Sequence, residues 1–333
     1  MAQKPDVISV GDIVTDVFIK LLDDQAREYT DDQGRWLTMP FATKIPFDMA
    51  ETIKGVGNAA NAAVAFARLG LNSAFATNVG SDQEGRDMIA ALQTNQVDTR
   101  FVSINQDKVS NVHYVLRYQV ERTILIHHEI YDYHWPHLRP DEMPSWIYFS
   151  SISQHAMEYH DQIADWLEGH PEVKMAFQPG TFQMDAGVER LRRIYAQSDI
   201  LIVNREEAAF ITGGNRDDYF DLLNRIHGLG AQVAVITDGP NGAVASDGKE
   251  VYRMPLYPDP APPVDRTGAG DAFASTFVAA LIKGNTLAGA LQWAPINSMS
   301  VLQKVGAQAG LLTEAELEHF LTNAPESYKP ERL

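Results

Sequence analysis

Short runs of β-branched and other apolar residues alternate along this chain with segments of helical period. The strand-like runs are residues 7–10, 146–150, 173–177, 200–203 and 233–237. The helix-like segments are residues 58–69, 83–94, 161–168, 188–196 and 217–229. Parallel strands need long crossover connections, which are usually helices. The alternation therefore predicts an α/β fold with a mostly parallel central sheet and helices on both faces.

Glycines and capping residues mark where several helices end or begin. Gly70 and Gly230 follow two of the helical segments and are predicted C-terminal stops. Thr313, with Glu316 three residues later, forms a capping-box pattern that predicts a further helix near the end of the chain.

Two segments interrupt the alternation, residues 15–22 and 111–127. We expect both to be antiparallel strands outside the main sheet, because apolar and polar residues alternate from Val112 to Tyr118. They are predicted to form a small β lid over the carboxyl ends of the parallel strands, where open α/β sheets bind ligands. The expected organisation is one α/β domain, residues 1–333, with a lid formed by about residues 15–50 and 108–130.

One face of the predicted lid sheet is apolar. It carries Val112, Tyr114 and Leu116, which must be buried against substrate, the main domain or another chain. The lid is therefore a candidate dimer surface, and we expect a homodimer.

Composition narrows the partners. With 333 residues, 45% of them apolar, the chain can build a full core. A formal net charge of −17 argues against a nucleic acid or a membrane surface as partner. Cysteine is absent, which excludes disulfides and thiolate chemistry. Neither a signal-peptide pattern nor an apolar run of about 18 residues is seen, so we expect a cytoplasmic protein that acts on a small molecule.

The stretch VDRTGAGDAF, from Val264 to Phe273, joins a glycine-rich turn, a carboxylate and a helix. Gly268, Ala269 and Gly270 leave their backbone N–H groups free to surround an anion at the start of that helix. A carboxylate beside a bound phosphate is unfavourable unless it has a task. Asp271 is therefore the candidate general base that accepts a proton from an incoming hydroxyl.

A second stretch, GVGNAANAAVAFARLG from Gly55 to Gly70, combines small residues with two asparagines. Asn58 and Asn61 offer amide donors and acceptors suited to a hydroxyl-rich ligand. The same glycines satisfy a loose dinucleotide fingerprint, which would indicate an oxidoreductase. Residues 48–54 oppose that interpretation, because they are charged and form no convincing buried strand before the glycines.

Together these stretches resemble the signatures of the ribokinase-like (PfkB) carbohydrate kinase family, in the family's order over nearly the whole chain. The resemblance implies a kinase that phosphorylates a hydroxymethyl group of a sugar. It implies Asp271 as the base and Gly268, Ala269 and Gly270 as the anion hole. The implied substrate-binding positions are Asp12, Asp16, Gly57, Asn61 and Asn111.

The resemblance also implies ATP and Mg²⁺ as cofactors. Asn204 and Glu207 fit the family's NxxE pattern, in which Glu207 would hold Mg²⁺ through water. The implied nucleotide-binding positions are Asn204, Glu207, Thr237, Gly239, Gly242 and Asn297. Asp265 and Thr267 fall where many family members hold a monovalent cation such as K⁺. The segment from Val79 to Gly85 is similar to the family's glycine-and-acid turn.

The chain departs from the family pattern at several positions. Val56 stands where a second glycine is frequent, which reshapes one wall of the sugar pocket. Arg266 replaces a frequent threonine, so either a phosphate contact or an altered cation site follows. Residues 293–308 fall where the adenine pocket is expected, yet Pro295 and Asn297 match no fixed pattern.

Two other functions stay open at this point. A nucleoside kinase would need an aromatic slot for the base, for which the candidates are Phe18, Trp36, Phe41, Tyr114 and Trp135. A non-catalytic sugar or nucleotide sensor is opposed by the intact GAGD and NxxE patterns. Few basic residues mark a phosphate pocket, which favours an unphosphorylated acceptor.

Histidines and an arginine near the lid have two interpretations each. A transition-metal site and a lid surface or substrate rim are both open for the cluster His127, His128, His134 and His137. Arg122 is either a ligand of a substrate phosphate or hydroxyl, or a solvated charge on a sheet edge.

Overall fold

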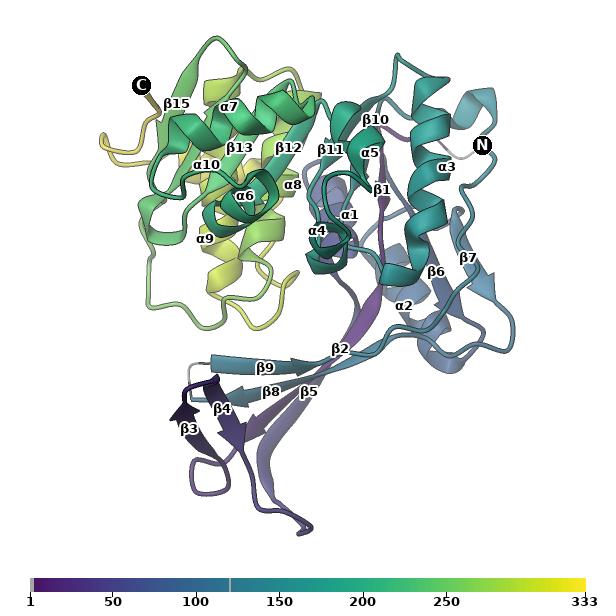
Figure 1. Cartoon of the computed structure of the whole chain (residues 1–333), viewed down its shortest axis with the longest axis vertical. Coiled ribbons are helices and arrows are strands. Elements are labelled where there is room, and N and C mark those ends of the chain that lie inside the picture. Colours follow the sequence, from purple (N-terminus) through teal and green to yellow (C-terminus); the bar gives the residue numbers. More distant parts are fainter. Residues whose placement is uncertain (1–2, 120) are drawn as a thin grey trace.

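The computed structural model describes residues 3–119 and 121–333, and within them ten strands form one central sheet (Figure 1). The strands are β1 (Val7–Val10), β6 (Ser73–Gly80), β7 (Val102–Asn105), β10 (Trp146–Phe149), β11 (Lys174–Phe177), β12 (Ile200–Asn204), β13 (Val233–Thr237), β14 (Ala243–Ser246), β15 (Val251–Met254) and β16 (Glu331–Arg332). Seven of them pair in parallel in the order β7-β6-β1-β10-β11-β12-β13. Strands β14, β15 and β16 extend the sheet in antiparallel fashion. The mostly parallel sheet is confirmed.

Helices cover both faces of this sheet, as predicted. They are α1 (Asn58–Arg68), α2 (Gln83–Thr94), α3 (Met157–Glu168), α4 (Thr181–Ala186), α5 (Arg192–Ala196), α6 (Arg205–Thr212), α7 (Tyr219–Leu229), α8 (Ala269–Ile282), α9 (Leu287–Leu302) and α10 (Glu314–Thr322), with short 3₁₀ turns at Pro140–Glu142, Gln154–Ala156 and Gly239–Asn241. Helices α3, α5 and α7 bury their apolar stripes in one core with Phe149 and Phe177. Helices α1, α8, α9 and α10 pack on the other face with Tyr148 and Phe277. The strands in the middle of the sheet are therefore buried on both faces.

Two of the predicted helix ends are confirmed, and one predicted helix is wrong in part. Gly230 ends α7 at a φ of 126°, and the capping box of Thr313 and Glu316 begins α10, both as predicted. The helix predicted over residues 188–196 is wrong in its first half, where only 192–196 is helical. Gly187, at a φ of 83°, ends α4 and redirects the chain, so residues 188–191 form a turn.

The lid projects from one edge of the main domain (Figure 1). Its sheet has the order β5-β2-β8-β9, from β2 (Val14–Leu21), β5 (Phe47–Val56), β8 (Val112–Tyr118) and β9 (Glu121–Leu125), and a separate hairpin joins β3 (Arg27–Asp31) to β4 (Gly34–Thr38). Strands β2–β5 and β8–β9 are antiparallel, but β2 and β8 pair in parallel, contrary to expectation. The reason is connectivity. Strands β2 and β8 follow the parallel strands β1 and β7 out of the same edge, so they run in the same direction.

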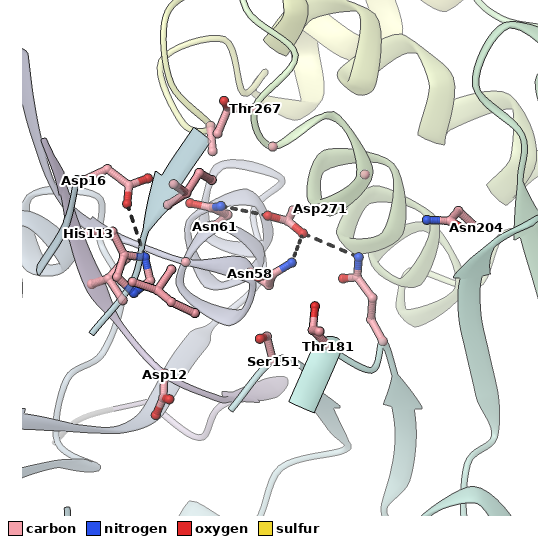
Figure 2. Close-up of a pocket in the computed structure, with 18 of the residues that line it drawn as sticks. Asp12, Asp16, Asn58, Asn61, His113, Ser151, Thr181, Asn204, Thr267 and Asp271 are labelled. Carbon is pink, nitrogen blue, oxygen red and sulfur yellow. Dashed lines mark hydrogen bonds and ion pairs between the residues drawn. The ribbon is translucent and has the colours of Figure 1, made fainter. Parts of the chain in front are cut away.

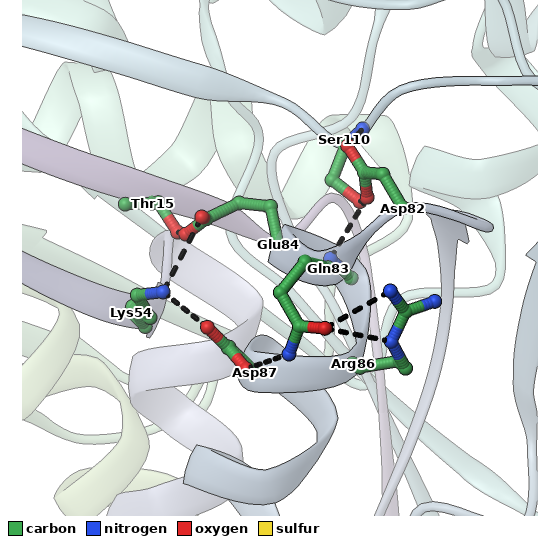
Figure 3. Close-up of polar contacts among 9 residues, drawn as sticks. Thr15, Lys54, Asp82, Gln83, Glu84, Arg86, Asp87 and Ser110 are labelled. Atoms are coloured by element: carbon green, nitrogen blue, oxygen red, sulfur yellow. Dashed lines mark hydrogen bonds and ion pairs between the residues drawn. The ribbon is translucent and has the colours of Figure 1, made fainter.

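Polar side chains tie the base of the lid to α2 (Figure 3). The hydroxyl of Thr15 on β2 donates to Glu84 Oε1 at 2.5 Å, and the ammonium of Lys54 on β5 lies 3.3 Å from Glu84 Oε2. Asp82 caps α2 and accepts from both the backbone N–H and the hydroxyl of Ser110, just before β8. The acid turn from Val79 to Gly85 thus holds the start of β2, the end of β5 and the start of β8.

The carboxyl ends of the parallel strands meet at the edge that the lid overhangs. Asp12 lies just beyond β1, and Ser151 and Gln178 lie just beyond β10 and β11. Asn204 and Thr237 are the last residues of β12 and β13. Ligands of open α/β sheets bind at this edge, so the fold gathers polar side chains where a site is expected.

Candidate active site

A pocket of about 560 Å³ lies between this edge and the lid (Figure 2). It contains most of the residues singled out from the sequence. Those that line it are Asp12, Asp16, Gly57, Asn61, Asn204, Glu207, Thr237, Thr267, Gly268, Gly270 and Asp271. Residues from the two halves of the chain thus converge on one cavity.

The glycine-rich turn before α8 has the conformation expected of an anion site. Gly268 is the N-cap of α8 with a φ of 80°, in the left-handed region that favours glycine. A Cβ at this position would lie 2.3 Å from the Cβ of Ala307, so any side chain would displace the facing loop. The helix therefore begins with small residues that leave its first N–H groups facing the pocket.

Asp271 sits in the first turn of α8, with 7% of its surface exposed. Its Oδ1 accepts from the amide of Asn58 at 2.9 Å, and its Oδ2 accepts from the amide of Asn61 at 2.8 Å. The amide of Gln178 donates more weakly to Oδ1, at 3.4 Å. Burial raises the pKa of Asp271 above its ordinary value, while the three amide donors pull the pKa down. The result is a fixed, partly desolvated carboxylate.

Further side chains orient these amides. The Nε2 of Gln308 donates to the Oδ1 of Asn61 at 3.0 Å, which directs the amide nitrogen of Asn61 toward Asp271. The hydroxyl of buried Tyr148 donates to the Oε1 of Gln178 and orients that amide in the same way. Nothing in the sequence alone assigns Gln178, Gln308 or Tyr148 to the site. Of the three, Gln178 alone has a sequence feature that predicts such a place, because it directly follows a predicted parallel strand.

The two aspartates near the start of the chain differ in their surroundings. Asp12 accepts from the hydroxyl of Tyr133 at 2.8 Å, the N–H of Ser153 at 2.8 Å and the ring of His128 at 3.1 Å. Its oxygens are therefore occupied by the protein. Among the described residues, the one basic group within 4 Å of the Asp16 carboxylate is the Nδ1 of His113, at 3.7 Å.

Asp16 on β2 and His113 on β8 are cross-strand partners, and their side chains lie next to each other in the pocket (Figure 2). Burial raises the pKa of Asp16 to about 6, opposed by the charge of Arg122 and assisted by that of Asp265. Burial and the nearby ring of His128 lower the pKa of His113 to about 4, so its imidazole is neutral at pH 7. The buried Nε2 of His113 has no hydrogen-bond partner among the described residues. Asp16 and His113 therefore leave polar atoms in the pocket without a hydrogen-bond partner among the described residues, and these atoms are available to a ligand.

The NxxE segment begins α6. Asn204 and Glu207 form a capping box, in which the Asn204 side chain accepts from the N–H of Glu207 and the Glu207 Oε2 accepts from the N–H of Asn204. No hydrogen bond within the described residues reaches the Oε1 of Glu207, which lines the pocket. Burial raises the pKa of this carboxyl. One carboxylate with a free oxygen fits Mg²⁺ held largely by water and phosphate.

The histidine cluster is dispersed in the structure. His128 binds Asp12, whereas His134 lies against Asp132 at 2.8 Å on the surface. Across residues 3–119 and 121–333, no three histidine, aspartate or glutamate side chains come together in a way that would hold a metal ion. His128 and His113 line the pocket, which favours the substrate-rim interpretation for this part of the lid.

Six predicted site residues lie outside the lining of the pocket, namely Asn111, Gly239, Gly242, Asp265, Ala269 and Asn297. Asn297 is buried, and its amide links Thr276 to the N–H of Leu312, so it joins α8, α9 and the following loop. The Oδ1 of Asn111 accepts from the N–H of Glu129 and holds the returning lid strand. For these two residues the structure places the side chain in packing rather than in the pocket.

Asp265 supports the loop beneath the pocket. Its Oδ1 accepts from the N–H and hydroxyl of Thr267, and its Oδ2 accepts from the N–H of Gly306. Burial alone would raise the pKa of Asp265, but these donors and the charge of Arg122 hold it below its ordinary value. Asp265 is thus an anionic anchor between two loops.

The aromatic residues considered for a nucleobase slot do not line the pocket. Phe41 is 95% exposed, Trp36 and Tyr114 are also exposed, and Phe18 is buried in the lid. Trp135 packs against Tyr159 and Trp166 instead. The pocket lining is mostly polar, with a few aliphatic side chains and one phenylalanine, Phe182, which packs edge-on against His128. This mostly polar lining suits a hydroxyl-rich ligand better than a base.

The chain is similar in sequence to known proteins over most of its length. A family model described as pfkB family carbohydrate kinase matches residues 52–314. The ATP-dependent 6-phosphofructokinase of Thermoanaerobacterium thermosaccharolyticum is 27% identical and covers 92% of this chain and 90% of its own length.

Solved structures share the fold at lower identity. Ribokinase of Arabidopsis thaliana, complexed with ribose and ATP, superposes with a TM-score of 0.76 at 19% identity and covers 96% of this chain and 99% of its own. A putative ribokinase II from E. coli, in complex with ATP and Mg²⁺, gives a TM-score of 0.75 at 17% identity with the same coverage of both chains. These likenesses establish the α/β fold with its β lid.

Proposed function

This chain belongs to the pfkB family of carbohydrate kinases, and from that premise we propose that it transfers the γ-phosphoryl group of ATP to a primary hydroxyl of a sugar. The observation that carries the proposal is the position of Asp271. This buried carboxylate lies in the first turn of α8, beside the N–H groups that suit a phosphate, and shares a pocket with Asp16 and Asn61. A base, an anion site and hydroxyl-binding groups are what an in-line transfer needs.

In the proposed reaction, the Asp271 carboxylate accepts the proton of the sugar hydroxyl. The hydroxyl oxygen then forms a bond to the γ-phosphorus, and the bond from that phosphorus to the β,γ-bridging oxygen breaks, which leaves ADP. The N–H groups from Gly268 to Gly270 stabilise the charge on the transferred group. Since burial raises the pKa of Asp271, its carboxylate is a stronger base than a solvated one.

Asp16 is the proposed principal ligand of the sugar hydroxyls. Its carboxylate has no hydrogen bond within the described residues, whereas that of Asp12 is filled by Tyr133, Ser153 and His128. Asp12 is therefore proposed to position this wall rather than to bind the sugar. Gly57, the N-cap of α1 at a φ of 115°, lets the chain pass close to Asp12 and leaves the pocket open there.

The nucleotide is proposed to lie toward Asn204, Glu207 and Thr237. When bound, Mg²⁺ would neutralise charge on the phosphates, with Glu207 holding it through water. Two structural relatives are described as complexes with ATP, and one of these also with Mg²⁺. We further propose that Gly239 and Gly242 shape the nucleotide loop and that Asp265 and Thr267 provide a site for K⁺. ATP as donor implies a cytoplasmic reaction. Among residues 3–119 and 121–333, no helix has the length and apolar character to cross a membrane.

A homodimer through the lid is also proposed. Cross-strand partners share a face, and Val17, Tyr114 and Leu125 form one such row on the side of the lid opposite Asp16. Tyr114 and Leu125 are 46% and 53% exposed. An apolar row of this kind is suited to burial against a second copy. The whole chain would then act as one kinase domain with its lid.

The test is ADP release with Mg·ATP across free sugars, sugar phosphates, sugar acids and nucleosides, with Asp271→Asn run beside the wild type. A sugar that releases ADP with the wild type and not with the variant supports the proposal. A nucleoside as the best acceptor, or nucleotide binding without transfer to any acceptor, contradicts it.

A further inference from the structure

The strand register sorts the side chains of the lid into two faces. Residues paired across strands point to the same face, as do residues two apart on one strand. The face that carries Asp16 therefore holds three cross-strand rows, Asp16–His113, Phe18–Val115–Ile124 and Lys20–Arg117–Arg122. We call it the inner face, because Asp16, His113, Arg122 and Ile124 line the pocket.

The third row of the inner face is cationic. Lys20 is neutralised by Asp48 at 2.6 Å. Arg117 and Arg122 lie directly opposite each other on neighbouring antiparallel strands. Within residues 3–119 and 121–333, no ion pair or hydrogen bond engages either guanidinium group. Like charges placed directly opposite on a sheet are destabilising unless something lies between them.

A third arginine approaches from the main domain. Arg266 precedes the anion turn of α8, and it lines a side pocket of about 200 Å³ together with Arg117 and Arg122. Arg122 and Arg266 also line the main pocket, so the two cavities are neighbours. Arg266 likewise has no ion pair within the described part of the chain.

The nearby carboxylates do not satisfy these arginines. Both oxygens of Asp265 accept from Thr267 and Gly306. Asp16 and Glu121 lie near but form no ion pair with Arg122 among the described residues. Elsewhere on this acidic chain, with 44 acidic and 27 basic residues, arginines such as Arg190 bind a carboxylate through two nitrogens. Within the described residues, these three guanidinium groups are unpaired, and they meet at the side pocket that adjoins the main one, which makes this place a site for an anion.

The place of these arginines relative to Asp271 indicates which anion they bind. Figure 2 shows Asp16 and His113 on one side of Asp271 and Asn204 on the other. Arg122 belongs to the Asp16 side, because it shares the inner face with Asp16. We infer that the acceptor is a sugar monophosphate, whose phosphate lies between Arg122 and Arg266 while its free hydroxyl faces Asp271. This inference rests on the proposed kinase function and reverses the expectation of an unphosphorylated acceptor.

The test compares matched acceptors at saturating Mg·ATP, namely ketohexoses and pentoses with the same sugars carrying a terminal phosphate. The phosphorylated member of the productive pair is expected to have the higher kcat/KM by about tenfold or more. Arg122→Gln and Arg266→Gln are each expected to raise KM for that acceptor about tenfold and to leave KM for ATP within about twofold. Arg192→Gln, at an exposed position of α5 away from the pocket, makes the same charge change and is the control.

The outcomes separate the two proposals. A free sugar preferred over its phosphate, or a rise in KM for ATP without one for the acceptor, assigns the arginines to another role and overturns the inference while the kinase function stands. Absence of transfer to every sugar, free or phosphorylated, overturns the proposed function itself. Melting curves of both variants that match the wild type show that the changes in KM do not arise from unfolding.

Discussion

The two walls of the pocket differ in how completely their polar atoms are satisfied. On the main-domain wall, Asp271 accepts from three amides and Asp12 from three donors. On the lid wall, Asp16 has one neighbour at 3.7 Å, and the guanidinium of Arg122 has no partner among the described residues. Side chains that are already hydrogen-bonded to the protein have a fixed geometry before a substrate binds, whereas unbonded side chains gain their partners from the substrate. Under the proposed function, the bonded main-domain wall would carry the chemistry and the unbonded lid wall would recognise the acceptor.

The architecture explains this division. The main-domain wall is built from strand ends and helix starts that are buried on both sides, so few rotamers are open to its side chains. The lid is a four-stranded sheet with a separate hairpin, and it is anchored at its base by Thr15, Lys54 and Glu84 (Figures 1 and 3). On its outer face, opposite the inner face, Tyr114 and Leu125 are exposed. A sheet held at one end can adjust to what binds beneath it.

The largest effect is expected at Asp271. Asp271→Asn keeps the size of the side chain but removes the proton acceptor, so kcat should fall by about a hundredfold or more. KM for ATP should change little, because the N–H groups of the anion turn remain. Steady-state kinetics with both substrates varied will measure this split. A variant that keeps wild-type kcat would remove the chemistry from the main-domain wall and so break the contrast between the walls.

The next effect is a loss of stability, expected from a substitution in the glycine-rich turn before α8. Gly268→Ala places a Cβ at a φ of 80° and 2.3 Å from the Cβ of Ala307, so the free energy of unfolding should fall by about 1–3 kcal/mol. Gly270→Ala is the matched control, because a Cβ there meets no atom within 4 Å. Thermal melting should show a lower Tm for the first variant only. Equal melting of the two would mean that the turn is not rigid.

The sequence predicts most of the main-domain wall and little of the lid wall. Gly268 to Asp271 and Asn61 stand out because a glycine turn, a helix start and amide side chains are visible within a few residues, whereas Asn204 is implied by the family resemblance. The strand runs and their mostly parallel pairing follow from the alternation of strand-like and helix-like segments. These features depend on short-range chemistry, which a single sequence displays.

What escaped prediction depends on contacts between distant segments. Gln178 and Gln308 reach the site through hydrogen bonds to residues 93 positions away or more. Asn297 matched the expected adenine segment, yet its amide is used to join helices. The cluster of Arg117, Arg122 and Arg266 arises only from strand register and loop docking. No spacing rule reports such convergence.

A modest effect on the pH profile is expected from Gln178. Gln178→Met removes one of the donors that lower the pKa of Asp271, so that pKa should rise further. Because the base must be deprotonated, the acid limb of kcat/KM against pH should move to higher pH. Tyr148→Phe removes the hydroxyl that orients Gln178 but keeps its amide, and should move the limb in the same direction but less far. A limb that stays in place in Gln178→Met would mean that this amide does not lower the pKa of Asp271.

The smallest effect on catalysis is expected on the outer face of the lid, which sharpens the contrast between the two faces of one sheet. Tyr114→Lys and Leu125→Lys place charge on the exposed row that we propose to meet a second copy. Light scattering should show a mass of two chains for the wild type and one chain for the variants, with kcat per chain within about twofold. Phe220→Lys changes a half-exposed aromatic on α7 instead and should leave the mass at two chains. If the outer-face variants lose kcat as strongly as they lose mass, the partner chain supports the acceptor side of the pocket. Recognition would then be a property of two lids rather than of one.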